Sequence, residues 1–144
     1  MKILMISPTQ SGIGGTAKHV QGLTNYLKSK NHSVKIISSE NTFTIPIKKL
    51  KNPSFMLSAL LKTKFGENYD IIHAHHPITA LAFKGSSGKK VVTFHGIFSN
   101  QIGLLHGKTA HKLSNKYEQN ALKWADAITA GSKDAFDYYS NQGY

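Results

Sequence analysis

The chain has 144 residues, of which 40% are hydrophobic and 17% are charged, a composition that suits one folded domain and excludes a disordered segment or a coiled coil. It contains no cysteine, which excludes a disulfide scaffold, a cysteine-ligated metal site and a cysteine nucleophile. The net charge of +11 comes from lysine alone, because the sequence has no arginine. Since proteins that read nucleic-acid sequence depend on arginine, we expect no nucleic-acid partner. The positive charge is then explained by an anionic membrane partner, by a phosphorylated ligand or by compositional bias.

The first half of the chain alternates between strand-like and helical segments. In order, the sequence predicts a strand over 1–7, a glycine-rich loop over 12–16, a helix over 17–30, a strand over 33–39, an irregular segment over 41–51 and a helix over 52–65. Thr16 is the expected N-cap of the first helix, and Asn31 can take the left-handed conformation that ends it. Asn52 followed by Pro53 is typical of a cap and a first helical residue.

The second half continues the alternation. The sequence predicts a strand over 70–74, a short helix over 76–83, a strand over 90–95, a glycine-containing loop over 96–107, a helix over 109–124, a strand over 126–130 and a last helix over 132–143 capped by Ser132. Such alternation predicts an α/β fold: a Rossmann-like parallel sheet with helices on both faces, in one domain that spans residues 1–144.

Ligands of such sheets bind at the carboxyl ends of the strands, where this sequence gathers small residues and histidines. The loop after the first strand fits the dinucleotide pattern G-x-G-x-x-A through Gly12, Gly14 and Ala17, and Glu40 follows the second strand, where a ribose-binding acid belongs. Alternatively, Gly14 and its neighbour in the loop expose backbone amides at a helix N-terminus, which favours a diphosphate. A flexible turn is the third interpretation.

Four motifs in order give the chain a family resemblance. They are GGTAKHV (14–20), YDIIHAH (69–75), VVTFHG (91–96) and LKWADAITAGS (122–132), the last of them preceded by Glu118. Together they resemble the N-terminal domain of retaining GT-B glycosyltransferases of family 4. The sequence departs from the family pattern at Asn31, where a glycine is usual, at Gly131, where a larger residue is frequent, and in the short segment between the second and third strands.

The resemblance implies an enzyme of two Rossmann-like domains. The N-terminal domain would hold a glycan or lipid-linked acceptor, and a C-terminal domain would hold the nucleotide-sugar, from which a hexose is transferred with retention and without a metal or other cofactor. We therefore expect residues 1–144 to be an N-terminal half that ends before its last strand and the donor domain, and to be inactive alone. Polysaccharide biosynthesis is the process that the resemblance suggests.

The resemblance also suggests roles for individual residues. His95 is the candidate catalytic residue, placed to hydrogen-bond a sugar hydroxyl. The candidate substrate-binding residues are Gly14, Gly15, His19, His75, Gly96 and Ser132. A strand-end histidine bonded to backbone is the alternative for His95, and a surface histidine is the alternative for His19. We expect His73 to be a buried structural residue.

Three other functions stay open at this point. The glycine loop with Glu40 allows a NAD-type oxidoreductase domain, and the run His73-Ala74-His75-His76 allows a metallohydrolase. The metallohydrolase lacks the further acids that such a site needs, because the chain has only 7. A non-catalytic binding module is the third alternative.

A basic segment and an apolar helix suggest a membrane surface as a partner. Lys48, Lys49 and Lys51 precede a predicted helix whose apolar arc is wide, and such a pattern is found in interfacial helices. A helix that simply covers the sheet is the alternative. The start of the chain lacks the apolar stretch of a signal peptide, so we expect a cytoplasmic protein that can lie peripherally at the inner face of the cell membrane.

Overall fold

The computed structural model describes residues 1–47 and 50–144. In this part of the chain, five parallel strands form one sheet in the order β2-β1-β3-β4-β5. The strands are β1 (Lys2–Ser7), β2 (Ser33–Ser38), β3 (Ile71–Ala74), β4 (Lys89–Phe94) and β5 (Ala127–Ala130). Every residue of β1 after the first is buried, as expected for a central strand that is covered on both faces.

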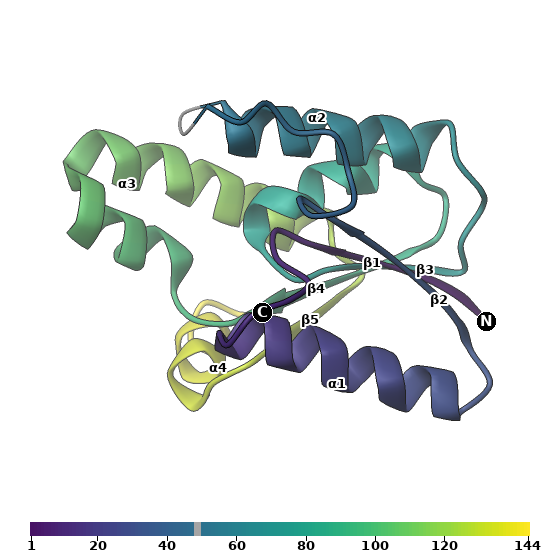
Figure 1. Ribbon diagram of the computed structural model, residues 1–144. Helices are drawn as coiled ribbons and strands as arrows, with labels where there is room; N and C mark the ends of the chain where they lie inside the picture. Colours follow the sequence, from purple (N-terminus) through teal and green to yellow (C-terminus); the bar gives the residue numbers. More distant parts are fainter. Residues whose placement is uncertain (48–49) are drawn as a thin grey trace.

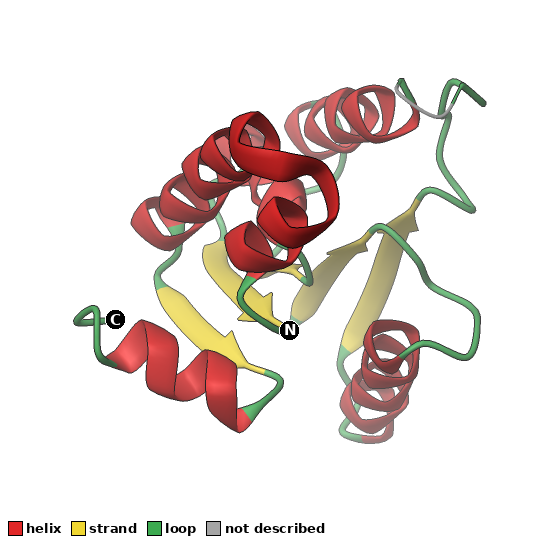
Figure 2. Ribbon diagram, turned by 90° about the vertical axis from the view of Figure 1, so that its left-hand side faces the viewer, coloured by secondary structure: helices red, strands yellow, loops and turns green. Residues whose placement is uncertain are grey.

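Helices lie on both faces of the sheet (Figures 1 and 2). On one face lies α1 (Gly15–Ser29), and on the other lie α2 (Lys51–Lys64), the 3-10 helix η1 (Pro77–Gly85) and α3 (Phe98–Trp124). The last helix, α4 (Lys133–Ser140), follows β5, and its buried residues Ala135 and Tyr139 belong to the same core cluster as buried residues of α3. One core cluster places Val20 of α1 against Ile3 and Met5 of β1. A larger cluster joins the sheet to the helices of the other face. The predicted Rossmann-like α/β fold is therefore confirmed.

Several helix ends differ from those predicted. The helix α1 begins at Gly15 with Gly14 as its N-cap, so Thr16 lies in the first turn and is not the cap. The helix α2 begins at Lys51, which puts Asn52 and Pro53 inside its first turn. Proline is accommodated there because the N–H groups of a first turn have no helical partner. Asn31 has a φ of 60°, as its proposed role at the end of the first helix requires.

The predicted loop over 96–107 is wrong, because the chain becomes helical again at Phe98. The helix α3 consists of two arms that meet at Gly107, whose φ of 81° and ψ of −175° are not helical. Only glycine adopts this conformation readily, so Gly107 reverses the chain and the arms form a helical hairpin, seen at the left of Figure 1. The three glycines of this segment suggested a loop, but the arms supply the contacts that make it helical.

The strand order determines where a ligand can approach. The chain passes from β1 to β2 on one side and then returns to β3 on the other side of β1. Such a switch opens a crevice at the carboxyl ends of the two central strands. In this molecule the loop after β1 and the histidines after β3 border that crevice.

Candidate functional site

The loop between β1 and α1 leads to an exposed helix N-terminus. Gly12 has a φ of 120°, which favours glycine, whereas Gly14 has an ordinary extended conformation as the N-cap. A Cβ atom added to Gly14 or Gly15 would meet no atom within 4 Å. The first turn of α1 contains no acidic residue. The N–H groups of an exposed first turn without an acidic partner favour an anion.

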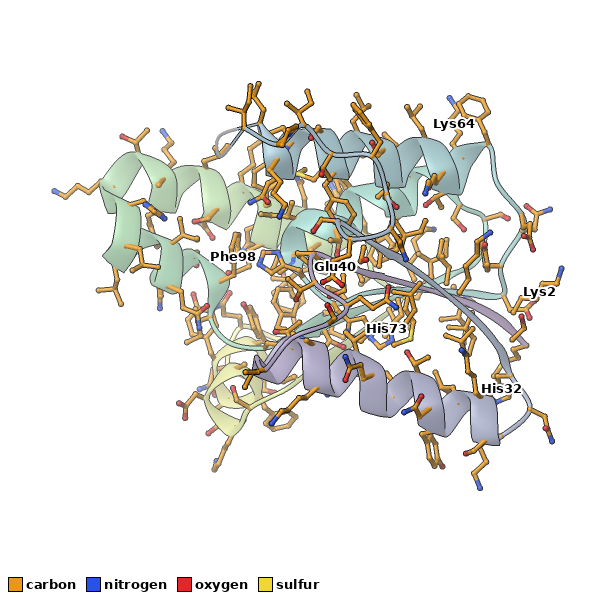
Figure 3. All side chains as sticks on the ribbon, in the orientation of Figure 1. Lys2, His32, Glu40, Lys64, His73 and Phe98 are labelled. Atoms are coloured by element: carbon orange, nitrogen blue, oxygen red, sulfur yellow. The ribbon has the colours of Figure 1, made fainter. Side chains whose placement is uncertain are left out.

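The side chain of Glu40 fixes this loop from the end of β2. Its carboxylate accepts hydrogen bonds from the backbone N–H of Gln10 at 2.9 Å and from the N–H of Ser11 at 3.1 Å, and also from the Ser11 hydroxyl at 2.7 Å. These bonds, first that from the Ser11 hydroxyl, lower the pKa of Glu40. Figure 3 shows Glu40 beside the loop. Because both carboxylate oxygens already have donors, the geometry disfavours the ribose-binding role that a dinucleotide site would need.

Three of the predicted histidines meet at the carboxyl edge of the sheet. His75 directly follows β3, His95 directly follows β4, and His19 lies near the start of α1. The ring centroid of His19 is 5.1 Å from that of His95 and 5.6 Å from that of His75, and the His75 and His95 centroids are 6.1 Å apart. Residues far apart in sequence thus form one cluster, which we call the histidine cluster: His19, His75 and His95.

The inner members of the histidine cluster retain hydrogen-bonding capacity. His75 is fully buried, whereas His19 is exposed. Among the described residues, none forms a hydrogen bond with either ring nitrogen of His75 or with Nε2 of His95. Buried polar atoms are normally hydrogen-bonded, so three unsatisfied nitrogens beneath one exposed side chain mark a place where a hydroxyl-bearing ligand or water can bind.

Burial keeps these imidazoles neutral. It strongly lowers the pKa of His75 and, together with the nearby His19, lowers that of His95. Burial also lowers the pKa of His73 and of His76 to about 4. At neutral pH about one in a thousand molecules would carry a proton at such a residue. A neutral imidazole both donates and accepts a hydrogen bond, which suits a sugar hydroxyl better than a phosphate.

His73 is hydrogen-bonded within the scaffold, as predicted, but it is only partly buried. Its Nε2 lies 2.7 Å from the hydroxyl oxygen of Thr93, and that hydroxyl lies 2.7 Å from the hydroxyl of Thr129. The three side chains connect β3, β4 and β5, and Figure 3 shows His73 on the side of the sheet that faces α1. The ring of His73 stacks on that of His75 with centroids 4.1 Å apart. The network fixes His73, and His73 in turn contacts His75. No pattern in the sequence indicates this network.

Two glycines near His95 permit close packing. A Cβ atom at Gly131 would lie 2.9 Å from Nδ1 of His95, closer than such atoms pack. The glycine that departs from the family pattern at this position thus makes room for the imidazole. At Gly96 a Cβ atom would overlap the side chain of Gln101 in α3. Gly96 therefore serves close packing here, and a substrate contact of this residue stays a prediction.

The remaining candidates lie around the same edge. The Ser132 hydroxyl accepts a hydrogen bond from the N–H of Ala135 at 3.2 Å, which confirms Ser132 as the N-cap of α4. His76 caps η1, and its ring packs edge-on against Phe98 at 4.6 Å. A pocket of about 160 Å³ borders His76 and contains no member of the histidine cluster; its lining comprises Pro8, Thr9, Thr16, Asn52, Phe55, His76 and Ile78. Thr9 and Asn52 were not recognised as site residues in the sequence, because they approach only in three dimensions.

The described residues offer little to a metal ion. No group of three or more His, Cys, Asp or Glu side chains in residues 1–47 and 50–144 has a suitable arrangement. In the histidine cluster, the rings of His19 and His95 meet edge to face. The run His73-Ala74-His75-His76 therefore does not form the strand-end metal site that a metallohydrolase needs.

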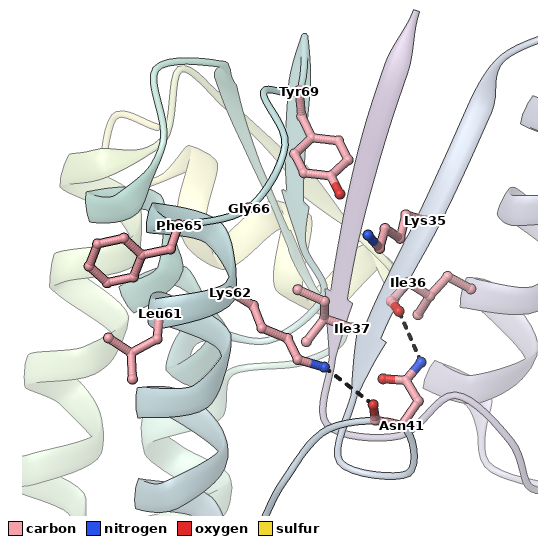
Figure 4. A pocket seen from close by; sticks show the side chains of 9 residues that line it. All are labelled: Lys35, Ile36, Ile37, Asn41, Leu61, Lys62, Phe65, Gly66 and Tyr69. Atoms are coloured by element: carbon pink, nitrogen blue, oxygen red, sulfur yellow. Dashed lines mark hydrogen bonds between the residues drawn. The ribbon is translucent and has the colours of Figure 1, made fainter.

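A larger hollow lies away from this edge (Figure 4). It measures about 630 Å³ and separates β2 from α2. In it, Asn41 covers part of the open strand edge, because its side chain donates to the Ile36 carbonyl at 2.9 Å and accepts from the Ser38 N–H at 2.8 Å. Lys62 donates to Thr42 at 3.0 Å and to the Asn41 carbonyl at 3.4 Å. No candidate site residue lines this hollow.

The predicted membrane segment is only partly described. Lys48 and Lys49 lie outside the described residues. The helix α2 packs on η1 and buries Phe55, Met56 and Ala59. Phe55 and Ala59 belong to the larger core cluster, so α2 covers the core, while Leu57 and Leu61 remain about half exposed. In the part of the chain that the structure describes, no helix is both long and apolar enough to cross a bilayer.

The chain was compared with protein families and with curated proteins. The family profile described as Glycosyltransferase Family 4 matches residues 13–144. The matched region begins within the loop after β1 and includes every predicted site residue. A comparison with curated proteins finds no match.

Proposed function

Because the chain belongs to glycosyltransferase family 4, we propose that it is the acceptor-side domain of a retaining enzyme that transfers a hexose from a nucleotide-sugar to a glycan or lipid-linked acceptor. One observation supports the proposal independently of family membership. The unsatisfied nitrogens of His75 and His95 lie at the same sheet edge as the exposed N-terminus of α1. A neutral hydrogen-bonding cluster and an anion-favouring helix end are what a sugar diphosphate requires of a protein.

The two features divide the chemistry between them. In the transfer, the anomeric carbon loses its bond to the diphosphate and gains a bond to an acceptor oxygen, whose proton passes to the departing diphosphate. Negative charge grows on the leaving diphosphate, and preorganised donors stabilise that charge. The N–H groups beyond Gly14 and Gly15 are such donors. His95, held neutral by burial, hydrogen-bonds a sugar hydroxyl, and His19 and His75 complete the wall of the crevice.

We propose that this domain works with a C-terminal, donor-binding domain and is inactive without it. Alone it would bind a nucleoside diphosphate weakly, because the family places most donor contacts in the other domain. The proposed setting is cytoplasmic, at an anionic membrane face, in polysaccharide biosynthesis. The lysine-rich composition and the net charge of +11 support an anionic surface as a partner.

Calorimetric titration of the chain with UDP, GDP and NAD tests the proposal. We expect weak binding of UDP or GDP that Gly15→Val abolishes, since a side chain at the helix end blocks close approach of a phosphate. Gly22→Val is the matched control, because Gly22 also lies in α1 with no atom within 4 Å of an added Cβ. Tight binding of NAD, or equal binding by the Gly15 and Gly22 variants, would contradict the proposal.

A further inference from the structure

The turn of α3 presents two aliphatic side chains to solvent, and we propose that it inserts into the surface of an anionic lipid membrane. Leu104 is 90% exposed and Leu105 is 74% exposed. Both lie just before Gly107, where the two arms of the hairpin meet. The inference deepens the proposed function and rests on it in one respect, namely that a membrane is where a lipid-linked acceptor lies.

The two leucines form an apolar tip with no internal partner in the described structure. Next to the tip, a hollow of about 470 Å³ is lined by Asn100, Gly103, Leu104, Gly107, Lys108 and His111. Aliphatic side chains at this exposure gain free energy whenever they leave water. Adjacent leucines at the end of a projecting hairpin can do so together, without any change in the core.

The hairpin holds the tip rigidly away from the body of the domain. Near its base, the buried Glu118 accepts hydrogen bonds from the N–H of Ser99 at 2.8 Å and from its hydroxyl at 3.3 Å. Halfway along, Nδ1 of His111 lies 2.8 Å from the Ser99 carbonyl oxygen, and a Cβ atom at Gly103 would lie 2.9 Å from the same ring nitrogen. The arms are therefore closely packed, and insertion of the tip would require little further ordering.

A row of lysines follows the tip along the second arm. Lys108, Lys112 and Lys116 are spaced by four residues, which places them on one face of the helix, and all three are exposed. None of them forms an ion pair with a described residue. The acid of α3 is Glu118, which is buried and occupied by Ser99. The face thus carries uncompensated positive charge that an anionic surface complements.

The chemistry of this face favours lipid over a nucleic acid. Single-stranded nucleic acids stack on aromatic side chains, and duplexes are read mainly by arginine. The tip is aliphatic, and the chain has no arginine. An aliphatic tip beside lysines is instead the arrangement of a membrane-surface anchor, in which apolar burial and attraction to anionic headgroups act together.

The position of the hairpin suits an acceptor held in a membrane. In Figure 1 the turn of α3 lies at the left of the molecule, the side at which the strands end and where the candidate site is found. The start of α2 lies at the same end. A membrane at this end would present a lipid-linked acceptor beside the histidine cluster.

Vesicle flotation of the full chain tests the inference. We expect the wild type to float with phosphatidylcholine vesicles that contain phosphatidylglycerol, and not with phosphatidylcholine alone. The double variant Leu104→Ser/Leu105→Ser should bind at least about tenfold more weakly, since it removes the apolar insertion. Lys108→Glu/Lys112→Glu should also weaken binding by about tenfold or more.

Two matched controls separate this surface from the rest of the chain. Lys28→Glu/Lys30→Glu makes the same charge change at exposed positions near the far end of α1, and it should weaken binding much less. Leu57→Ser/Leu61→Ser removes two exposed leucines from α2 and should float like the wild type. Circular dichroism melting checks that each variant is folded.

Three outcomes would overturn the inference. They are absence of wild-type flotation, flotation of the tip variant equal to that of the wild type, and loss of binding in the α2 variant alone. Light scattering without lipid adds a fourth, because a wild-type dimer that the tip variant dissociates would mean that a second copy covers the leucines. None of these results affects the UDP titration, so failure here is distinguishable from failure of the proposed function.

Discussion

The buried carboxylate of Glu118 accepts a hydrogen bond from the backbone N–H of Ser99, 2.8 Å away, at the N-terminus of the first arm of α3. The N–H groups of a first helical turn lack intrahelical partners, and the helix dipole favours a negative charge beside them. Glu118, which lies on the second arm, therefore caps the first. The glutamate of the fourth sequence motif thus has a structural task, away from the proposed chemistry.

Replacement of Glu118 by alanine should destabilise the domain by about 2–3 kcal/mol, because hydrogen bonds to a charged acceptor are lost and the Ser99 N–H is left buried. Urea denaturation followed by circular dichroism measures the change. Glu67→Ala is the control, since its ion pairs with Lys2 and Lys35 are exposed and such pairs contribute less than about 1 kcal/mol. Equal destabilisation by the two variants would mean that the hydrogen bonds of Glu118 stabilise the domain no more than the exposed ion pairs of Glu67 do.

Acid should destabilise the domain before its carboxylates are protonated. The pKa values of His73 and His76 are about 4 in the folded state, and that of His75 is also strongly lowered, against about 6.5 when unfolded. Above the unfolded value all three are neutral in both states and contribute no pH dependence. Below it the unfolded chain binds protons that the folded chain excludes, so stability falls by about 1.4 kcal/mol per pH unit for each histidine.

Denaturation curves at about pH 7.5 and about pH 5.5 detect this loss. The pKa of Glu40 is lowered, so its contribution is lost only at more acidic pH and does not confuse the comparison. His73→Asn should reduce the slope, because the pKa of His73 is lowered in the folded state. A stability that is flat between the two pH values would show that the buried imidazoles accept protons without cost.

The sheet was predictable because each strand is an apolar run of the length that a buried parallel strand needs. The approach of His75 to His95 was predictable for a related reason, since both residues directly follow parallel strands and therefore share one edge. His19 lies in α1, and a surface position was an open alternative for it. By contrast, the helical first arm of α3 was not predictable from local sequence. The glycines at 96, 103 and 107 favour a loop over 96–107, whereas the packing of Gly103 against His111 and the cap from Glu118 stabilise the helical arm.

The residues that hold the site histidines in place could not be predicted from the sequence either. Gly131 shows as a departure from the family pattern, but its close approach to His95 exists only because β4 and β5 are neighbours. The same holds for the side chain of Thr93, which contacts His73, and for that of Thr129, which contacts Thr93 in turn. Local patterns identify the residues of an edge, whereas contacts between strands determine which of them are held in place.

His95→Ala should lower turnover by at least about tenfold in an enzyme that contains this domain together with its donor domain, which corresponds to about 1.4 kcal/mol of transition-state stabilisation. The reason is the loss of a neutral hydrogen-bonding imidazole at the crevice. Initial rates with saturating nucleotide-sugar measure the effect, and an unchanged melting temperature shows that the fold is intact. Wild-type turnover would remove His95 from the site.

A second variant separates the position of His95 from its presence. Gly131→Ala brings a methyl group against the imidazole, because a Cβ atom at this position would lie 2.9 Å from Nδ1 of His95. Turnover should therefore fall although the imidazole remains. Gly22→Ala, at an open position in α1, serves as the control and should be fully active.

Gly107→Ala should open the hairpin of α3. The φ of 81° with a ψ of −175° at Gly107 is a conformation that side chains disfavour, even though no atom lies within 4 Å of an added Cβ. The cost is therefore conformational and amounts to about 1–3 kcal/mol.

Gly22→Ala is again the matched control, since an alanine inside a helix stabilises it by about 0.5–1 kcal/mol relative to glycine. Urea denaturation should give opposite signs for the two variants, and faster amide exchange at Ser99 would show that the strain separates the arms. If Gly107→Ala is as stable as the wild type, the chain reverses without need of glycine, and the arms alone determine the hairpin.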